Sequence, residues 1–180
     1  MRKNTNINQM VRAAVIIALG IVLPIFFHVF GQNAGAVFLP MHIPILIGGF
    51  MLSPIYALLT GIITPLLSHL FTGMPPFPIV YVMILELAAY GFFTSLFYNR
   101  IKLGMYPSLI LAMLVGRGFN IAGVYTIMHM IMGKPFKFKV VATGLFIKGF
   151  PGIAIQLILI PLIVYGIRRS LSIERDSRTM

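Results

Sequence analysis

The stretch Val37-Phe38-Leu39-Pro40-Met41-His42-Ile43-Pro44-Ile45-Leu46-Ile47-Gly48-Gly49-Phe50 decides how the rest of the chain is interpreted. Pro40 and Pro44 fix φ and disfavour helix at the residues before them, so they predict a bent entry into a short apolar helix that carries a glycine pair. His42 lies between the two prolines. Irregular backbone at membrane depth is tolerated only where protein or a cavity satisfies its polar groups. We therefore expect this stretch to form the lip of a binding site, walled by the flanking hydrophobic segments.

Composition identifies an integral membrane protein. Of the 180 residues, 59% are hydrophobic and 9% are charged, and the mean hydropathy is +0.98. Average soluble domains carry about 25% charged residues. The net charge of +11 arises from 14 Lys and Arg against 3 Asp and Glu, but most basic residues flank apolar runs, where they act as topology signals rather than as a nucleic-acid surface. The absence of cysteine excludes disulfides and thiolate metal sites.

Hydrophobic runs predict an all-α membrane protein, a bundle of six transmembrane helices in a single membrane domain over residues 1–180. A span needs roughly 20 apolar residues. The candidates cover about residues 11–30, 43–52, 55–71, 79–98, 106–131 and 141–167, and prolines interrupt the first and the third. The second is short and could form one re-entrant hairpin with the third. The first is too long for a signal peptide and lacks a cleavage site, so we expect a retained helix. Residues 170–180 form a polar tail that we expect to be disordered.

The basic clusters predict that both termini are cytoplasmic. Such clusters precede the first span, join the fourth and fifth, and follow the sixth, all on one side of a six-span bundle. The loop over residues 133–139 then lies outside, although it carries three lysines. Either this short loop is tolerated outside because the three other basic clusters determine the orientation, or it forms a positive rim that attracts an anionic solute.

Three ionisable residues inside predicted spans are the first candidates for a functional site, because such residues are costly in a membrane. Glu86 lies in the fourth span, Arg117 in the fifth and Lys148 in the sixth. At about 1.5 Å per residue, Glu86 and Arg117 reach similar depth and can pair, either as a structural ion pair or as part of a ligand site. Lys148 lacks a carboxylate partner, since Glu174 and Asp176 lie in the tail. A buried lysine loses its proton or binds an anion, which favours an acid-bearing ligand; snorkelling to the outer surface is the alternative.

The histidines predict hydrogen bonding around a wet vestibule rather than a metal site. His28, His69 and His129 fall near outer span ends, and His42 lies in the opening stretch. A metal site needs clustered ligands with a supporting carboxylate, and no His-x-x-x-His or His-Glu pair occurs. Further polar and stacking groups could come from Gln32, Asn33, Asn120, Gln156, Phe77, Tyr81, Tyr125 and Phe136.

The sequence contains no Gly-x-Ser-x-Gly, His-Glu-x-x-His or Walker motif, so we expect neither an enzyme nor a bound cofactor. A chain of this size cannot hold both an ATPase and a pore, so transport would need energy from another protein. Two alanines one turn apart, Ala14 and Ala18, form a face that allows close helix approach, as do the small residues of the fifth span at Gly116, Gly118 and Gly123.

Taken together, these residues resemble the substrate-binding S components of energy-coupling factor (ECF) transporters, the vitamin importers of bacteria and archaea. The small size, the six spans and the Ala14-x-x-x-Ala18 motif are similar to that family, in which the motif faces the transmembrane coupling subunit. The block over residues 38–76 looks like the family's first two outer loops and intervening helices, with its segments Pro40-Met41-His42-Ile43-Pro44, Gly48-Gly49, Ser53-Pro54 and Thr72-Gly73-Met74-Pro75-Pro76. The resemblance covers roughly residues 11–169.

The resemblance implies a high-affinity binding protein of the bacterial plasma membrane that delivers a vitamin inward with a transmembrane T component and two ATPase subunits. In that family the ligand lies near the outer surface, between the loop after the first helix and the fourth to sixth helices. By region, the substrate-binding candidates are His42, Glu86, Arg117, Asn120, His129 and Lys148. The metal-binding members use an N-terminal histidine arrangement that this chain lacks. Because Arg117 and Lys148 stand against a single Glu86, we expect a vitamin with a carboxylate. Pantothenate is the first candidate substrate, and pyridoxine or hydroxymethylpyrimidine come next. A membrane scaffold without a ligand, a self-sufficient secondary carrier and an intramembrane enzyme are the alternatives.

Overall fold

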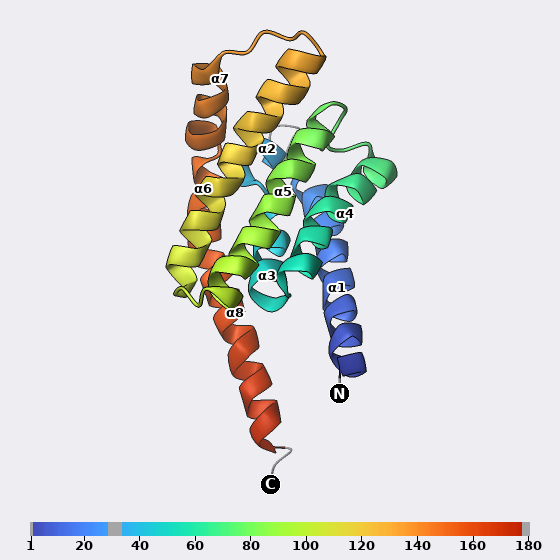
Figure 1. The fold of residues 1–180 in the computed structure, drawn as a ribbon, viewed down its shortest axis with the longest axis vertical. Coiled ribbons are helices and arrows are strands. Elements are labelled where there is room, and N and C mark those ends of the chain that lie inside the picture. Colours follow the sequence, from blue (N-terminus) through green and yellow to red (C-terminus); the bar gives the residue numbers. More distant parts are fainter. Residues whose placement is uncertain (1, 29–33, 178–180) are drawn as a thin grey trace.

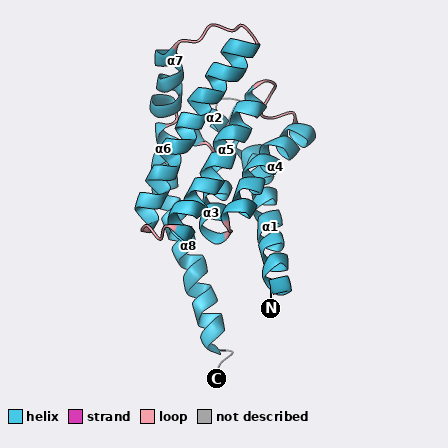
Figure 2. Ribbon diagram, in the orientation of Figure 1, coloured by secondary structure: helices cyan, strands magenta, loops and turns pink. Residues whose placement is uncertain are grey.

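The computed structural model describes residues 2–28 and 34–177, which form helices joined by turns and loops (Figure 2). No strand occurs within these described residues, so the all-α prediction is confirmed for them. In chain order the elements are α1 (Arg2–His28), α2 (Ala34–Phe38), α3 (His42–Met51), α4 (Pro54–Thr72), α5 (Ile79–Ser95), η1 (Leu96–Arg100), α6 (Met105–Gly123), η2 (Val124–Ile131), α7 (Phe138–Ala142), η3 (Thr143–Lys148) and α8 (Phe150–Ser177), where η denotes a π-helical segment.

Five helical segments of the described residues are long and apolar enough to cross a membrane, and these candidate spans begin at Asn6 (within α1), Pro54, Ile79, Met105 and Phe150. The second predicted span corresponds to α3, which has only 10 residues. In Figure 1, α2 and α3 together bring the chain back to the end of the bundle where α4 begins, and both described termini lie at that same end. The count of six membrane spans therefore stays a prediction, since α3 is shorter than a full crossing requires.

The entry into α3 follows from the proline-marked stretch. Leu39 adopts a left-handed conformation with φ 52°, which is uncommon for a residue with a side chain, and it bends the chain sharply between α2 and α3. Its carbonyl accepts a hydrogen bond from the His42 amide at 3.1 Å. Pro44 is tolerated in the first turn of α3 because amides there lack an intrahelical partner. The helix thus begins at His42, one residue earlier than predicted.

The other end of α3 is satisfied by side chains from distant helices. Asn99 donates to the carbonyls of Gly49 at 3.2 Å and Leu52 at 3.1 Å, and Ser95 donates to Leu52 at 2.6 Å. Arg168 of α8 adds a hydrogen bond to the Phe50 carbonyl at 3.3 Å. The last carbonyls of a helix have no intrahelical partner, and leaving them unpaired inside a membrane is expensive. These contacts explain how a helix as short as α3 can end within the bundle.

Two glycines bring the backbones of α4 and α5 into direct contact. A Cβ atom on Gly61 would overlap the backbone at Leu87, and one on Gly91 would overlap the backbone at Ala57. Small residues permit such close approach between membrane helices, where van der Waals packing drives association. On the other flank of α5, Gly116 of α6 makes room for a neighbouring side chain in the same way. We therefore describe α4, α5 and α6 as a closely packed wall.

Several predicted boundaries need correction. Pro65 lies inside α4 without breaking it, and residues 170–177, predicted as a disordered tail, continue α8. The predicted sixth span is divided at Gly149, a turn between η3 and α8. Residues 29 and 30, predicted to end the first span, and residues 178–180 of the predicted tail lie outside the described residues.

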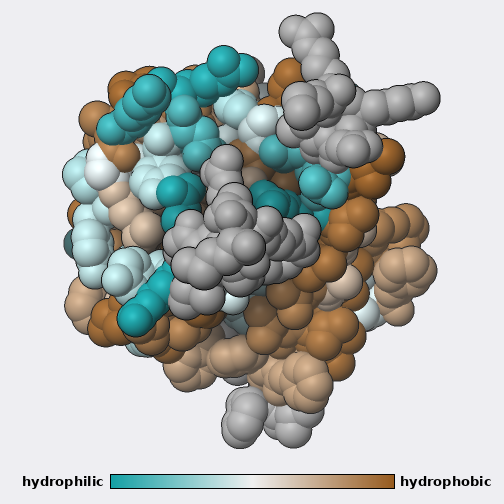
Figure 3. Space-filling model, turned by 90° about the horizontal axis from the view of Figure 1, so that it is seen from below, coloured by the Kyte–Doolittle hydropathy of each residue, from teal (hydrophilic) through white to brown (hydrophobic). Residues whose placement is uncertain are grey.

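The surface suits a lipid environment. Large apolar side chains such as Phe26, Leu70, Ile158 and Leu162 are exposed. Figure 3 views the end that carries the termini and shows hydrophilic surface at the centre and upper left, with hydrophobic surface along the right and lower sides. Exposed basic residues of this end include Arg12, Arg100, Lys102, Arg168 and Arg169.

Candidate functional site

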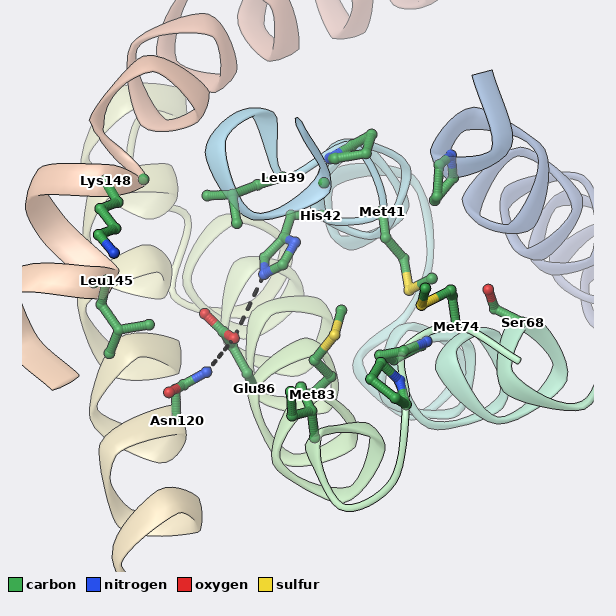
Figure 4. A pocket seen from close by; sticks show the side chains of 18 of the residues that line it. Leu39, Met41, His42, Ser68, Met74, Met83, Glu86, Asn120, Leu145 and Lys148 are labelled. Atoms are coloured by element: carbon green, nitrogen blue, oxygen red, sulfur yellow. Dashed lines mark hydrogen bonds and ion pairs between the residues drawn. The ribbon is translucent and has the colours of Figure 1, made fainter. Parts of the chain in front are cut away.

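A cavity of about 580 Å³ lies where the entry of α3 meets α5, α6 and η3. Figure 4 shows Lys148 and Leu145 on one side, Met41, Met74 and Ser68 on the other, and His42, Glu86 and Asn120 between them. Its described lining consists of Pro24, Gly35, Leu39, Pro40, Met41, His42, Ser68, Met74, Pro75, Pro76, Ile79, Met83, Glu86, Arg117, Asn120, Gly144, Leu145, Lys148 and Gly149. The volume falls within the range of about 300–1,000 Å³ typical of small-molecule pockets.

Glu86 is the centre of a polar cluster at the base of this cavity. Its Oε1 accepts hydrogen bonds from Arg117 Nη1 at 2.8 Å and from the Tyr90 hydroxyl at 3.0 Å. Its Oε2 accepts one from Asn120 Nδ2 at 2.6 Å, and His42 Nε2 lies 3.5 Å from the same oxygen. The exposed fraction of Glu86 is 2%, and its carboxylate is saturated by these neighbours. Burying a charge is costly unless it is paired and hydrogen-bonded, and both conditions are met here.

Helical spacing produces this convergence. Glu86 and Tyr90 are four residues apart on α5, and Arg117 and Asn120 are three apart on α6, so each pair shares one face of its helix. Gly116 completes the arrangement, because a Cβ atom there would overlap the Tyr90 ring. The tyrosine can therefore lie between α5 and α6 and turn its hydroxyl toward Glu86.

His42 enters the cluster from the opposite side. It is the first residue of α3, is 3% exposed, and meets the Tyr90 ring edge to face with centroids 5.4 Å apart. Apart from the ion-pair distance to Glu86, neither ring nitrogen has a hydrogen-bond partner among the described residues. A buried polar atom without a partner is costly, so the imidazole has unused hydrogen-bonding capacity at the cavity.

The cavity has more positive charge than negative charge. Arg117 is 3% exposed and uses Nη1 for Glu86, while Nε and Nη2 have no hydrogen-bond partner in the described part of the chain. Nη2 lies near Gly149, which belongs to the cavity wall. Lys148 lines the same wall, and no described side chain forms an ion pair with it. Because Arg117 already neutralises Glu86, Lys148 leaves an uncompensated positive charge.

The remaining walls are aliphatic, with thioether and proline groups opposite the charged side. Met41, Met74 and Met83 line the cavity, and Figure 4 shows Met41 and Met74 together with Ser68. The loop carrying Met74 is held by His69, whose Nδ1 lies 2.8 Å from the Pro75 carbonyl. Methionine side chains adapt to irregular shapes, so this half of the cavity can fit a flexible or branched ligand surface.

Residues 8–164 match the family model described as "ECF transporter, substrate-specific component". This chain belongs to that family. The match supports a membrane-embedded, multi-pass subunit that binds the substrate of a transporter, and the long apolar helices agree with it. No curated protein and no solved structure matches the chain.

In this S component, five of the six predicted substrate-binding residues line one cavity: His42, Glu86, Arg117, Asn120 and Lys148. His129 does not. Its Nδ1 lies 2.8 Å from the Lys134 carbonyl, and its ring packs beside Tyr125 and Phe136 at the end of the bundle opposite the termini. The possible ion pair between Glu86 and Arg117 is formed. The expectation of a buried Lys148 is wrong, because the residue is exposed.

The other polar and aromatic candidates of the S component lie elsewhere. Gln156 is buried and donates from Nε2 to the Leu39 carbonyl at 3.5 Å, behind the cavity lip. Phe77 and Tyr81 are exposed and pack against each other edge to face. Gln32 and Asn33 lie outside the described residues. The three methionines of the cavity were missed, since methionine in an apolar segment gives no sequence signal for a site.

The described lining of this S component's cavity provides several groups for the recognition of a ligand. It offers a guanidinium with free donors, a lysine ammonium, an imidazole and an amide beside aliphatic walls. Charged donors of this kind form the stronger class of hydrogen bonds to carboxylates and phosphates. Within the described residues, no group of three or more His, Cys, Asp or Glu side chains is arranged to hold a metal ion.

Proposed function

We propose that this S component captures a small, water-soluble vitamin or vitamin precursor with an acid group, and that the cavity at the α3 entry is its binding site. The proposal assigns His42, Arg117 and Lys148 to ligand contact, with Glu86 and Asn120 orienting Arg117. His129 is assigned to the outer surface, where it contacts Lys134, Tyr125 and Phe136, rather than to ligand contact in the cavity.

The observation that carries the proposal is the excess of positive charge around a saturated carboxylate. Glu86 accepts hydrogen bonds from Arg117, Tyr90 and Asn120, so it has little capacity left for a ligand ammonium. Arg117 Nε and Nη2 have no hydrogen-bond partner, and Lys148 has no ion pair among the described side chains. A ligand carboxylate would supply both partners.

Among the known substrates of such transporters, pantothenate fits these properties first. It combines one carboxylate with hydroxyl and amide groups on a branched aliphatic chain, and the cavity combines cations with aliphatic and thioether walls. Pyridoxine and hydroxymethylpyrimidine rank next, because they are small and polar but bring no acid group to the cations.

The proposed setting is a bacterial plasma membrane with both termini in the cytoplasm, so that the cavity faces outward. The basic residues at the end that carries the termini support this orientation. A transmembrane T component and two ATPase subunits would then supply the energy for delivery inward. Ala14 and Ala18 are exposed on α1, and this small-residue face is the proposed contact with the T component.

Native mass spectrometry of the detergent-purified chain tests the capture function directly, followed by identification of any small molecule released on denaturation. We expect one acid-bearing vitamin per chain. The double variant Arg117→Ala, Lys148→Ala should lose this ligand, and binding at full strength would remove the basis of the proposed chemistry.

Other outcomes separate the alternatives. If nothing co-purifies and a vitamin panel leaves the thermal stability unchanged, the chain is better explained as a membrane scaffold. Uptake driven by protons or sodium in vesicles that contain only this chain would indicate a secondary carrier. Turnover of a lipid or small molecule without partners would indicate an enzyme.

A further inference from the structure

Three lysines form a positively charged surface at the end of the bundle opposite the termini. Lys134, Lys137 and Lys139 lie in the connection between η2 and α7 and in the first turn of α7, and all three are exposed. This connection is the uppermost loop in Figure 1. We call these three residues the outer lysine rim. By the orientation proposed above, the rim faces the outside, where basic residues are less common.

The rim has no acidic neighbour at its end of the molecule. The whole sequence contains three acidic side chains, Glu86, Glu174 and Asp176. Glu86 is buried and paired with Arg117, and the other two belong to the last part of α8 at the opposite end. The field of the rim is therefore not cancelled locally, as it would be on a surface of mixed charges.

The position of the rim is defined by contacts to η2. The Lys134 amide donates to the Met128 carbonyl at 2.9 Å, and the Lys134 carbonyl lies 2.8 Å from His129 Nδ1. Phe136 meets the Tyr125 ring edge to face at 5.2 Å. These contacts fix the backbone at Lys134 and the ring of Phe136 against η2, so the loop that carries the rim has a defined position.

Positive charge continues from the rim to the cavity. Lys139 and Lys148 belong to the same helical arm, α7 and η3, nine residues apart, which at about 1.5 Å per residue corresponds to about 14 Å. Lys148 lines the cavity, and Arg117 lies at its base. The Debye length is about 8 Å at physiological ionic strength. The rim therefore attracts an anionic solute while it approaches the protein, whereas Lys148 and Arg117 interact with a solute that is already in the cavity.

We infer that the outer lysine rim is an electrostatic capture surface that accelerates the association of an anionic ligand with the cavity. This inference rests on the proposed function, and it adds that the ligand approaches as a net anion. A surface of this kind raises the association rate and its salt dependence, and it leaves the dissociation rate nearly unchanged.

The test compares rate constants for a charged probe and its neutral analogue, pantothenate and panthenol, which differ by a carboxylate in place of a hydroxymethyl group. The full chain is placed in nanodiscs of zwitterionic lipid. The rim variant is Lys134→Gln, Lys137→Gln, Lys139→Gln. Its matched control is Arg12→Gln, Arg100→Gln, Lys102→Gln, which removes three exposed cations from the opposite end.

We expect the rim variant to associate with pantothenate roughly tenfold more slowly at low salt, within the range of about 10- to 1,000-fold known for electrostatic steering. Its dissociation rate should match that of the natural chain, and the difference should vanish at about 0.5 M salt, where the Debye length is only about 4 Å. Panthenol rates and the control variant should be unaffected.

Three results would overturn the inference: unchanged association of pantothenate, equal slowing of panthenol, or an effect that occurs only in nanodiscs with anionic lipid. The last result would assign the rim to lipid headgroups. If pantothenate does not bind, the charge of the co-purified ligand decides between the outcomes. A neutral or cationic ligand refutes the rim inference and the proposed acid group but leaves the capture of a small molecule intact. An anionic ligand replaces pantothenate in the same assay, and a chain without any ligand refutes both proposals.

Discussion

Arg117 Nη1 lies 2.8 Å from Glu86 Oε1, which joins α6 to α5 through two opposite charges that are almost completely buried. The Tyr90 hydroxyl shares the same oxygen, and Asn120 binds the other. Removing one partner from such a pair leaves an uncompensated charge, whereas removing both partners can be nearly neutral. We therefore expect α5 and α6 to tolerate the loss of both charges better than the loss of either one.

The variant Glu86→Gln should be destabilised by about 3–5 kcal/mol, because it leaves the Arg117 guanidinium buried without a counter-charge. Unfolding of the purified chain in detergent, followed by heat or denaturant, measures the loss. The double variant Glu86→Gln, Arg117→Met should recover most of the stability while losing the acid-bearing ligand. A double variant as unstable as the single one would contradict this account.

The variant Gly116→Ala should lose about 1–3 kcal/mol, since its new methyl group would overlap the Tyr90 ring in a closely packed interior. Gly118→Ala is the matched control two residues away, where a Cβ atom meets nothing within 4 Å. Alanine favours helix over glycine by about 1 kcal/mol, so the control should be neutral or slightly more stable. Thermal unfolding measures the stability of both variants. Equal stability would show that Gly116 is not needed to make room for the Tyr90 ring.

Much of the helical framework could be predicted from hydropathy, because long apolar runs bounded by prolines, glycines and basic residues have few alternatives in a membrane. The division of the last predicted span at Gly149 was missed because hydropathy alone defined that span, although Gly149, Pro151 and Gly152 are turn signals in the sequence. The contact between α4 and α5 could not be predicted, because Gly61 and Gly91 become informative only when the two helices are known to be neighbours.

Replacing His69 by alanine should weaken ligand binding severalfold, because the loop bearing Met74 and Pro75 would lose its hydrogen bond to α4. One such bond contributes about 0.5–1.5 kcal/mol. The matched control is Ser108→Ala, which removes a side-chain hydrogen bond to the Leu103 carbonyl away from both the cavity and the rim. Isothermal titration with the identified ligand measures both affinities. Equal losses in the two variants would show that the effect is not specific to the cavity wall.

The variant Lys148→Gln should bind pantothenate about tenfold more weakly than the natural chain, since a hydrogen bond to a charged group contributes about 1.5–3 kcal/mol and Lys148 is partly solvated. The affinity for panthenol should change little. Lys102→Gln, at the opposite end, serves as the control for a general loss of charge. A similar loss for both ligands would mean that Lys148 shapes the cavity rather than binding an acid.

The double variant Ala14→Leu, Ala18→Leu should keep the stability and ligand affinity of the isolated chain, because both alanines are exposed on α1. Co-purification with the T component should be lost, since two leucines would prevent close helix approach. Ala122→Leu places the same bulk on an exposed position of α6 and is the matched control. Undiminished co-purification of the α1 variant would move the proposed interface away from these alanines.

The candidate site was only partly accessible to sequence reasoning. Glu86, Arg117 and Lys148 stand out because charges are rare in apolar helices, and the similar depth of the first two made a pair between them possible. Tyr90 could have been found from its position one helical turn after Glu86. The opposite wall could not have been found from the sequence, because Met41 and Met74 come together through two loops whose paths depend on the whole fold.

The glycine contacts between α4 and α5 have a mechanical consequence. At Gly61 and Gly91 the backbones of the two helices touch, so no side chain separates them at these two points and relative sliding there is sterically opposed. This half of the molecule then behaves as a fixed frame. We therefore expect the entry of a solute to be accommodated by the other side of the cavity, which α2 lines with Gly35 and the segment from α7 to Gly149 lines with Leu145 and Lys148.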